Sequence, residues 1–360
     1  MALVAADAAP ARYEYSEPHM GTTARVVLYA ADRAQAERAA RAAFARIAAL
    51  DQALSDFRPD SELMRLCARA GQGAVAIGAD LFRVLDAAQA LAERSHGAFD
   101  ATSGSLIRLW RGARRLGELL APARIADARA RSGYRRLQLD ATRRTATLEA
   151  GTCLDLGGIA KGDAADQALA AMAAHGAARA LVAIGGDVAV AAPPPGEDGW
   201  TVAVAALAVP GAPPIGELRL RDAAVSTSGD AEQWMSVGGR RYSHILDPRS
   251  GWPMTVRSST TVVARRGIDA DGLATAVAVL GPEQGLRLVE RTDGAAVFML
   301  RQEADGRVTV HTSPRWSEVV HLDVGPDQGP LALDTRRSVA VLHAEDEIAP
   351  IRAHLVVDVP

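Results

Sequence analysis

The sequence has 360 residues, of which 49% are hydrophobic and 23% are charged, and its formal net charge is −3. This length and composition support one large buried core or two ordinary ones, which excludes a broadly disordered protein. The near-neutral charge predicts no attraction to nucleic acid, and no apolar run approaches the ~20 residues of a membrane-spanning helix. Lysine and arginine together number 40, and Lys161 is the only lysine among them.

The first residues show no clear pattern, and we expect a flexible lead-in over residues 1–17. This segment lacks the basic and long apolar regions of a signal peptide, so we expect a cytoplasmic location for the chain as given, with a clipped or mis-started precursor as the alternative. Cys67 and Cys153 are too few for a disulfide framework. They are interpreted as buried apolar residues, and a single disulfide is the alternative.

The predicted elements alternate between strands and helices along the chain. Residues 23–29 are rich in β-branched side chains and predict a strand, whereas residues 32–50 repeat apolar side chains at helical spacing. The other predicted strands are 180–184, 259–264 and a hairpin of 134–139 with 145–149, and the other predicted helices are 79–94, one ending near 174, 271–280 and 283–290. The order lacks strict βαβ alternation, which favours an α+β fold over a doubly wound sheet.

The first stretch that points to chemistry is LDLGGIAKG, residues 154–162. An apolar strand meets two glycines and then a helix, where backbone N–H groups at the helix start suit a phosphate or another anion. Lys161 adds a positive charge at that position. An ordinary strand-to-helix turn with a surface lysine would give the same pattern, so both interpretations stay open.

Two further stretches carry candidate catalytic groups. Asp271 and Thr275 are four residues apart, so they share one helix face, and their hard oxygen atoms suit Mg²⁺; a helix-capping aspartate is the alternative. His244 precedes the strong turn at 247–251 and is a candidate acid or base, with a structural histidine as the alternative.

Glycine turns and one aromatic complete the candidates. The turns at 184–187 and 226–230 follow strand-like runs and can present backbone N–H groups to a ligand, or serve only as tight turns. Residues 97–102 place polar groups among apolar ones. Phe57 can stack on a planar ligand, although such an aromatic is more often part of a core.

Taken together and in this order, these stretches resemble the FAD:protein FMN transferase family (flavin transferases, ApbE). The matching segments are MGT at 20–22, the run 55–63, GAFDAT at 97–102, LDLGGIAKG at 154–162, IGGD at 184–187, TSGD at 227–230 with YSHILDPRSG at 242–251, and 271–275. The resemblance covers residues 18–312 and implies a flavin transferase domain there, followed by an extension of unknown role over 313–360. The implied fold is a T-fold-related mixed sheet and helix architecture with the active site in a cleft between lobes.

The resemblance also implies an activity. Such enzymes use Mg²⁺, cleave FAD and move its FMN half to a threonine hydroxyl of an acceptor flavoprotein, releasing AMP. By the same resemblance, Asp271, Thr275 and the backbone carbonyl of Ala160 would hold Mg²⁺, and Asp271 and His244 would be catalytic, with His244 as general base or phosphate contact. The residues expected to contact FAD are Met20, Phe57, Asp100, Ala101, Thr102, Gly157, Lys161, Asp163 and Ile245.

Two other functions stay open at this point. The chain can be an FAD pyrophosphatase that passes FMN to water, or a non-catalytic FAD-binding protein. Retention of Asp271, Thr275 and His244 argues against simple binding, which does not need a metal-ligand pair beside a base. Two departures from the family pattern concern the flavin site: Phe57 stands where tyrosine is frequent, and Asp163 places a negative charge near the expected phosphate path.

Overall fold

A nine-stranded antiparallel sheet forms the centre of the computed structural model, which describes residues 9–204, 207, 216–230, 233–319 and 339–342. Its strand order is β1-β2-β6-β7-β10-β15-β16-β17-β18, and every neighbouring pair is antiparallel. The strands are β1 Ala11–His19, β2 Thr22–Ala30, β6 Ala180–Ile184, β7 Asp187–Val190, β10 Ala223–Gly229, β15 Ser258–Ala264, β16 Ala296–Gln302, β17 Val308–Thr312 and β18 Val339–Leu342. The predicted α+β class is confirmed.

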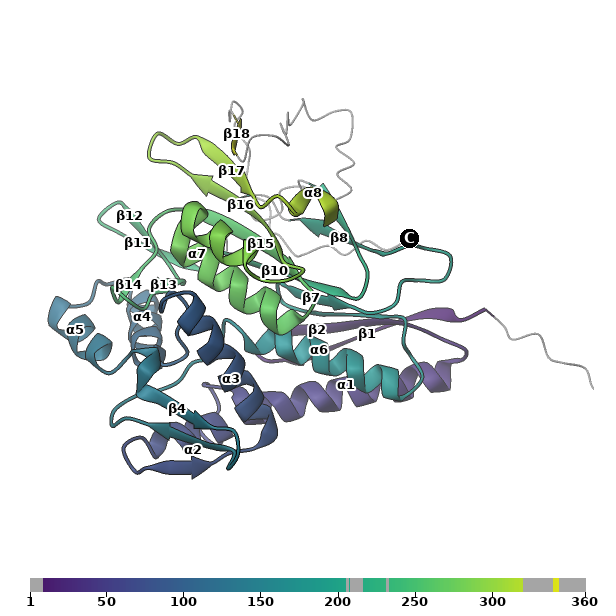
Figure 1. Ribbon diagram of the computed structural model, residues 1–360, viewed down its shortest axis with the longest axis horizontal. Helices are drawn as coiled ribbons and strands as arrows, with labels where there is room; N and C mark the ends of the chain where they lie inside the picture. Colours follow the sequence, from purple (N-terminus) through teal and green to yellow (C-terminus); the bar gives the residue numbers. More distant parts are fainter. Residues whose placement is uncertain (1–8, 205–206, 208–215, 231–232, 320–338, 343–360) are drawn as a thin grey trace, which may run out of the picture.

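Three long helices pack on one face of this sheet: α1 (Arg33–Leu54), α6 (Ala160–Ala174) and α7 (Gly267–Glu290) (Figure 1). Side chains alternate across the sheet in β2, where Val26 and Leu28 join the core under the helices and Val27 joins the core on the opposite face. That opposite face is covered by the hairpin of β8 (Trp200–Val204) and β9 (Gly216–Leu220) and by α8 (Trp316–Val319). Both faces of the sheet are therefore buried in its central strands β6, β7 and β15.

Local signals explain where the helices begin and end. The side chain of Asp32 caps α1 by accepting a hydrogen bond from the backbone N–H of Gln35 at 2.7 Å. The predicted helices 271–280 and 283–290 form α7, which is interrupted at Gly281. Gly281 has φ 73°, a conformation that glycine tolerates and other residues rarely adopt, and Pro282 follows it.

A second lobe packs beside α7 around its own apolar cluster (Figure 1). Its elements are α4 (Gly104–Leu116), α5 (Pro122–Ala130), β11 (Trp234–Val237), β12 (Arg240–Ser243), β13 (Leu246–Asp247) and β14 (Trp252–Pro253). The indole N–H of Trp110 in α4 donates to the carbonyl oxygen of Gly251 at 2.8 Å, which joins the helix to the turn before β14.

A smaller unit completes the described chain. It contains α2 (Glu62–Ala68), α3 (Ala79–Arg94), the short 3₁₀ helix η1 (Tyr134–Arg136) and a three-stranded sheet of β3 (Ala74–Ala76), β4 (Leu137–Asp140) and β5 (Thr145–Leu148). The strands β4 and β5 form the hairpin that the sequence predicted.

The central sheet extends beyond both expected boundaries of the domain. Residues 11–17, expected to belong to a flexible lead-in, lie in β1 and pair with β2 along the whole strand. In the expected extension from residue 313, α8 packs on the sheet and β18 pairs with β17; residues 320–338 and 343–360 lie outside the described part. Among the described residues, no helix is long and apolar enough to cross a bilayer.

Candidate active site

Lys161 lies between two buried aspartates at the start of α6. Its Nζ is 2.9 Å from Oδ2 of Asp187, the first residue of β7, and 3.6 Å from Oδ2 of Asp271 in α7. It also donates to the carbonyl oxygen of Gly157 at 3.2 Å. The backbone N–H of Gly162 donates to Oδ2 of Asp271 at 3.1 Å, so the first turn of α6 is fixed directly against α7.

The charges of this group do not balance. Burial and then the neighbouring carboxylate of Asp187 raise the pKa of Asp271 to about 7. Burial alone would lower the pKa of Lys161, but the carboxylates of Asp187 and Asp271 raise it above its ordinary value, so it stays charged. When both carboxylates are ionised, one ammonium faces two negative charges, and this excess suits a bound cation.

The oxygen atoms beside this group are of the kind that Mg²⁺ prefers. Thr275 follows Asp271 by one turn of α7, and its Oγ1 lies 3.3 Å from Oγ of Ser228. A Cβ at Gly158 would come within 2.9 Å of the same Thr275 oxygen, so the glycine turn lies directly against it. Within the described ranges no three His, Cys, Asp or Glu side chains cluster as a metal site, so a cation here would also need hydroxyl or backbone oxygens such as the Ala160 carbonyl.

His244 lies between β12 and β13, in the second lobe. Its backbone N–H and its Nδ1 both face the carbonyl oxygen of Gln233, at 3.0 and 3.1 Å. An Nδ1 beside a carbonyl oxygen carries the proton, which leaves Nε2 as the proton acceptor. Partial burial lowers the pKa of His244, so the neutral ring predominates near pH 7, and the ring is still accessible to solvent.

The side chain of Ile245 is buried, and its expected contact with FAD stays a prediction. It packs against Ala278 and Val279 of α7, the helix that carries Asp271. Ile245 therefore joins the turn that carries His244 to α7.

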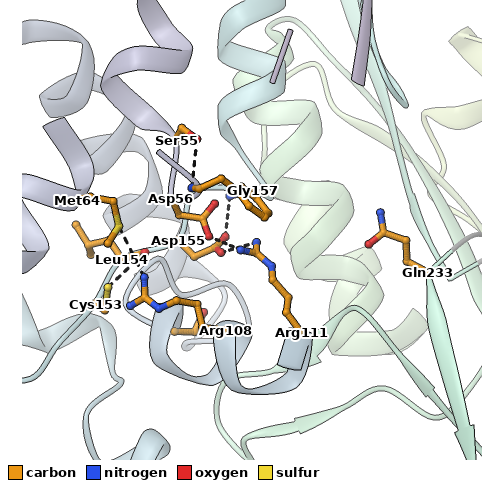
Figure 2. Close-up of polar contacts among 12 residues, drawn as sticks. Ser55, Asp56, Met64, Arg108, Arg111, Cys153, Leu154, Asp155, Gly157 and Gln233 are labelled. Carbon is orange, nitrogen blue, oxygen red and sulfur yellow. Dashed lines mark hydrogen bonds and ion pairs between the residues drawn. The ribbon is translucent and has the colours of Figure 1, made fainter. Parts of the chain in front are cut away.

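The glycine turn is held by a group of charged side chains (Figure 2). Asp155, which is buried, accepts a hydrogen bond from the backbone N–H of Gly157 at 2.8 Å and another from Arg111 at 2.8 Å. Arg111 also forms an ion pair with Asp56, and its guanidinium lies over the ring of Phe57. Burial and then the Asp56 charge raise the pKa of Asp155 to about 6.

Two cysteines lie behind this turn. Cys67 and Cys153 are free thiols. The backbone N–H of Leu154 donates to Sγ of Cys67 at 3.1 Å, which fixes the end of α2 against the extended segment that enters the turn.

Of the expected FAD contacts, Met20 and Phe57 are in positions suited to that use. Met20 lines a cavity of about 1180 Å³ together with Thr22, Arg58 and Gly185. This cavity reaches the turn between β6 and β7, where Asp187 meets Lys161. The side chain of Phe57 is 76% exposed, so it is not part of a core, which was the alternative interpretation of this aromatic.

Three neighbouring residues, Asp100, Ala101 and Thr102, are used inside the protein. Thr102 is fully buried, donates its hydroxyl to Asp100 at 2.6 Å and accepts from the backbone N–H of Gly133 at 2.8 Å. The carbonyl oxygen of Ala101 accepts from the backbone N–H of Asp155 at 2.8 Å. In this arrangement these residues support the segment before the glycine turn, and their expected contact with FAD stays a prediction.

Asp163 also differs from its expected position on the phosphate path. It is buried and accepts two hydrogen bonds from Arg83 of α3, at 3.0 and 2.7 Å. Arg83 also pairs with Asp80, which pairs with Arg46 of α1. Asp163 therefore belongs to an ion-pair network that holds α1, α3 and α6 together.

Several residues of the site were not predicted. Asp155 and Asp187 lie inside the motifs at 154–162 and 184–187, so the sequence contained a signal that they belong to the site. Asp56 also stands inside a motif, the run 55–63, whereas Arg111 and Gln233 stand outside recognisable patterns, and only the fold brings them to the site.

The mixed helix and sheet fold is that of a known class of enzymes, the flavin transferases. The ApbE family model matches residues 20–299. A FAD:protein FMN transferase of Treponema pallidum is 33% identical over 306 residues, which cover 80% of this chain and 84% of that protein.

Solved structures agree with this match. The flavinyl transferase ApbE of Pseudomonas stutzeri, in its apo form, has a TM-score of 0.74 at 29% identity and covers 89% of this chain and 99% of its own. The ApbE protein of Thermotoga maritima has a TM-score of 0.75 at 28% identity and covers 86% and 99%. The chain belongs to the ApbE family, which confirms the resemblance found in the sequence.

Proposed function

We propose that this protein transfers the FMN half of FAD to a threonine hydroxyl of an acceptor flavoprotein, with Mg²⁺, and releases AMP. The observation that carries the proposal is the position of Lys161 between Asp187 and Asp271, beside Thr275 and the glycine turn. The names of the relatives, FAD:protein FMN transferase and flavinyl transferase, support the same reaction.

Asp271, Thr275 and the carbonyl oxygen of Ala160 would hold Mg²⁺ at this place. When bound there, the ion would neutralise charge on the diphosphate of FAD. Lys161 supplies a second positive charge, and it stands at the N-terminal end of α6, which is the positive end of the helix dipole. These groups lower the cost of bringing an oxygen nucleophile to a negatively charged phosphorus atom.

His244 is the proposed general base. Its Nε2 accepts the proton of the threonine hydroxyl as the threonine oxygen bonds to the FMN phosphorus, and the bond between that phosphorus and the bridging oxygen of AMP breaks. The Gln233 carbonyl keeps the proton of the neutral ring on Nδ1. Because the ring is neutral near pH 7, it is ready to accept this proton.

The first experiment combines purified protein, FAD, Mg²⁺ and an acceptor protein that carries the target threonine. We expect a covalently fluorescent acceptor and one AMP for each FMN transferred. Formation of free FMN and AMP alone would replace the transferase with an FAD pyrophosphatase, and FAD that is bound but unchanged would exclude both activities.

A pair of variants tests the metal assignment. Asp271→Ala is expected to abolish Mg²⁺-dependent release of AMP, because Asp271 is the only carboxylate in the proposed ligand set. Asp269→Ala is the matched control, because Asp269 lies on the same helix and pairs with exposed Arg266. Equal turnover in both variants would refute the assignment of Asp271 as a metal ligand.

A further inference from the structure

Arg111 of α4 joins two chain segments that are far apart in the sequence (Figure 2). One of its terminal nitrogens bonds to Asp56, and the other donates to Oδ2 of Asp155 at 2.8 Å. The side chains of Asp56 and Asp155 are only 8% and 4% exposed. The guanidinium is therefore the cation that compensates two buried carboxylates.

The first of these segments carries an exposed ring. The guanidinium carbon of Arg111 lies 4.4 Å from the centre of the Phe57 ring, and Phe57 is 76% exposed. A cation at this distance from a ring attracts it and fixes its orientation. The ring is thus supported on one side by Arg111 and remains widely open to solvent, where a planar ring of a ligand can stack.

The second segment carries the glycine turn. Asp155 uses Oδ2 for Arg111 and Oδ1 for the backbone N–H of Gly157. A Cβ at Gly157 would lie 4.0 Å from the same terminal nitrogen of Arg111, so the turn and the guanidinium are close neighbours. One side chain thus sets the place of both Phe57 and Gly157.

We propose that Arg111 is a positioning residue for FAD, which holds the ring platform at Phe57 and the phosphate-binding turn at Gly157 at one fixed separation. The inference rests on the proposed placement of FAD against these two residues. A ring and a diphosphate that belong to one covalent molecule need binding elements at a defined distance, and binding elements that are already in place lose less free energy on binding.

This role predicts a specific kinetic effect. Without Arg111, Asp56 and Asp155 are two buried carboxylates with no cation between them, which disfavours the present arrangement of both segments. In the described contacts Arg111 reaches Lys161 only indirectly, through Asp155 and Gly157, and it does not contact Asp271, so we expect a larger change in FAD binding than in the chemical step. Loss of ground-state binding alone raises KM and leaves kcat unchanged.

The test measures AMP release from FAD in the presence of Mg²⁺. Arg111→Met is expected to raise KM for FAD about tenfold, with kcat within about threefold of the parent, as loss of about 1.4 kcal/mol of binding requires. Arg111→Lys is expected to have a KM between those of the parent and Arg111→Met. A lysine keeps the charge but cannot bridge two carboxylates and stack on the Phe57 ring at once. If Arg111→Met does not fold, the KM of Arg111→Lys for FAD tests the inference.

Arg46→Met is the matched control. Arg46 is 26% exposed, against 25% for Arg111, and it bonds to Asp80 and Gln167 away from the glycine turn. Its replacement is expected to lower stability and leave KM for FAD unchanged. An equal rise of KM in the Arg46 and Arg111 variants would mean a general loss of stability and would overturn the inference.

Phe57→Ala separates this inference from the placement of FAD. It is expected to raise KM by itself and to add little in the Arg111→Met background, because both changes remove the same platform. Unchanged KM in Phe57→Ala overturns the placement of FAD and the inference with it. If Phe57→Ala raises KM and Arg111→Met does not, or if the two effects multiply, the placement stands and the inference fails.

Discussion

Replacing Gly162 with alanine is expected to separate α6 from α7. A Cβ at Gly162 would lie 2.0 Å from the carbonyl oxygen of Gly267 and 2.8 Å from Cβ of Asp271. Ordinary contacts begin at 3.4 Å, so the helices have to move apart by more than 1 Å, and the obstacle is backbone that no side-chain rotation relieves. The same movement lengthens the hydrogen bond from the Gly162 N–H to Asp271.

The size of the effect follows from three contributions. Overpacking costs about 1–3 kcal/mol, with a rigid backbone contact at the upper end, and loss of the hydrogen bond adds about 1 kcal/mol. Alanine returns about 1 kcal/mol as the better helix former. We therefore expect Gly162→Ala to lower the free energy of unfolding by about 3 kcal/mol, measured as a shift of the urea midpoint with tryptophan fluorescence as the signal.

Gly112→Ala in α4 is the control for this measurement. A Cβ at Gly112 meets no atom within 4 Å, so alanine is expected to stabilise the protein by about 0.5–1 kcal/mol. If Gly162→Ala unfolds at the same urea concentration as the parent, or above it, the close approach of α6 and α7 is not a tight contact and the reasoning is refuted.

Three other predictions concern charge. Lys161→Arg is expected to lower kcat for AMP release at least about tenfold, because a broader cation crowds the space beside Asp271; full activity would return Lys161 to the role of an ordinary lysine. Removal of Mg²⁺ with EDTA is expected to stop AMP release, and added Mg²⁺ to restore it. Burial raises the pKa of Asp166 from 3.8 to about 6, so the folded protein binds the extra proton and stability falls as pH rises between these values. Asp166→Asn should flatten that slope in urea titrations at pH 4 and 6.

Much of the fold follows from local patterns. The helix 79–94 and the strand 180–184 were predicted with the bounds that the structure has, because their apolar spacing or continuous apolar run is strong. β1 was missed because it is an edge strand whose side chains are mostly exposed, and its apolar alternation is short, limited to Tyr13 and Tyr15 on either side of Glu14. Its position depends on pairing with β2, which is a tertiary interaction.

The site divides in the same way. Asp271 and Thr275 were predicted as a pair from their helical spacing, which is local information. Asp163 stands in the same motif as Lys161, yet it faces Arg83, 80 residues earlier in the sequence. The bond from Arg111 to Asp56 also joins distant residues, 55 apart. Packing decides which face of α6 contacts α3 and which residues α4 contacts. The sequence next to each helix does not determine these contacts.

The two edges of the central sheet, β1 and β18, come from opposite ends of the described chain. During synthesis, β1 can pair as soon as β2 leaves the ribosome, because only two residues separate them. The other edge stays open at β17 until residues 339–342 have been made, and an open edge of this kind offers its backbone groups to any other chain. Completion of this sheet therefore waits for the last of its described strands, and a chain shortened before residue 339 would carry an edge that favours self-association.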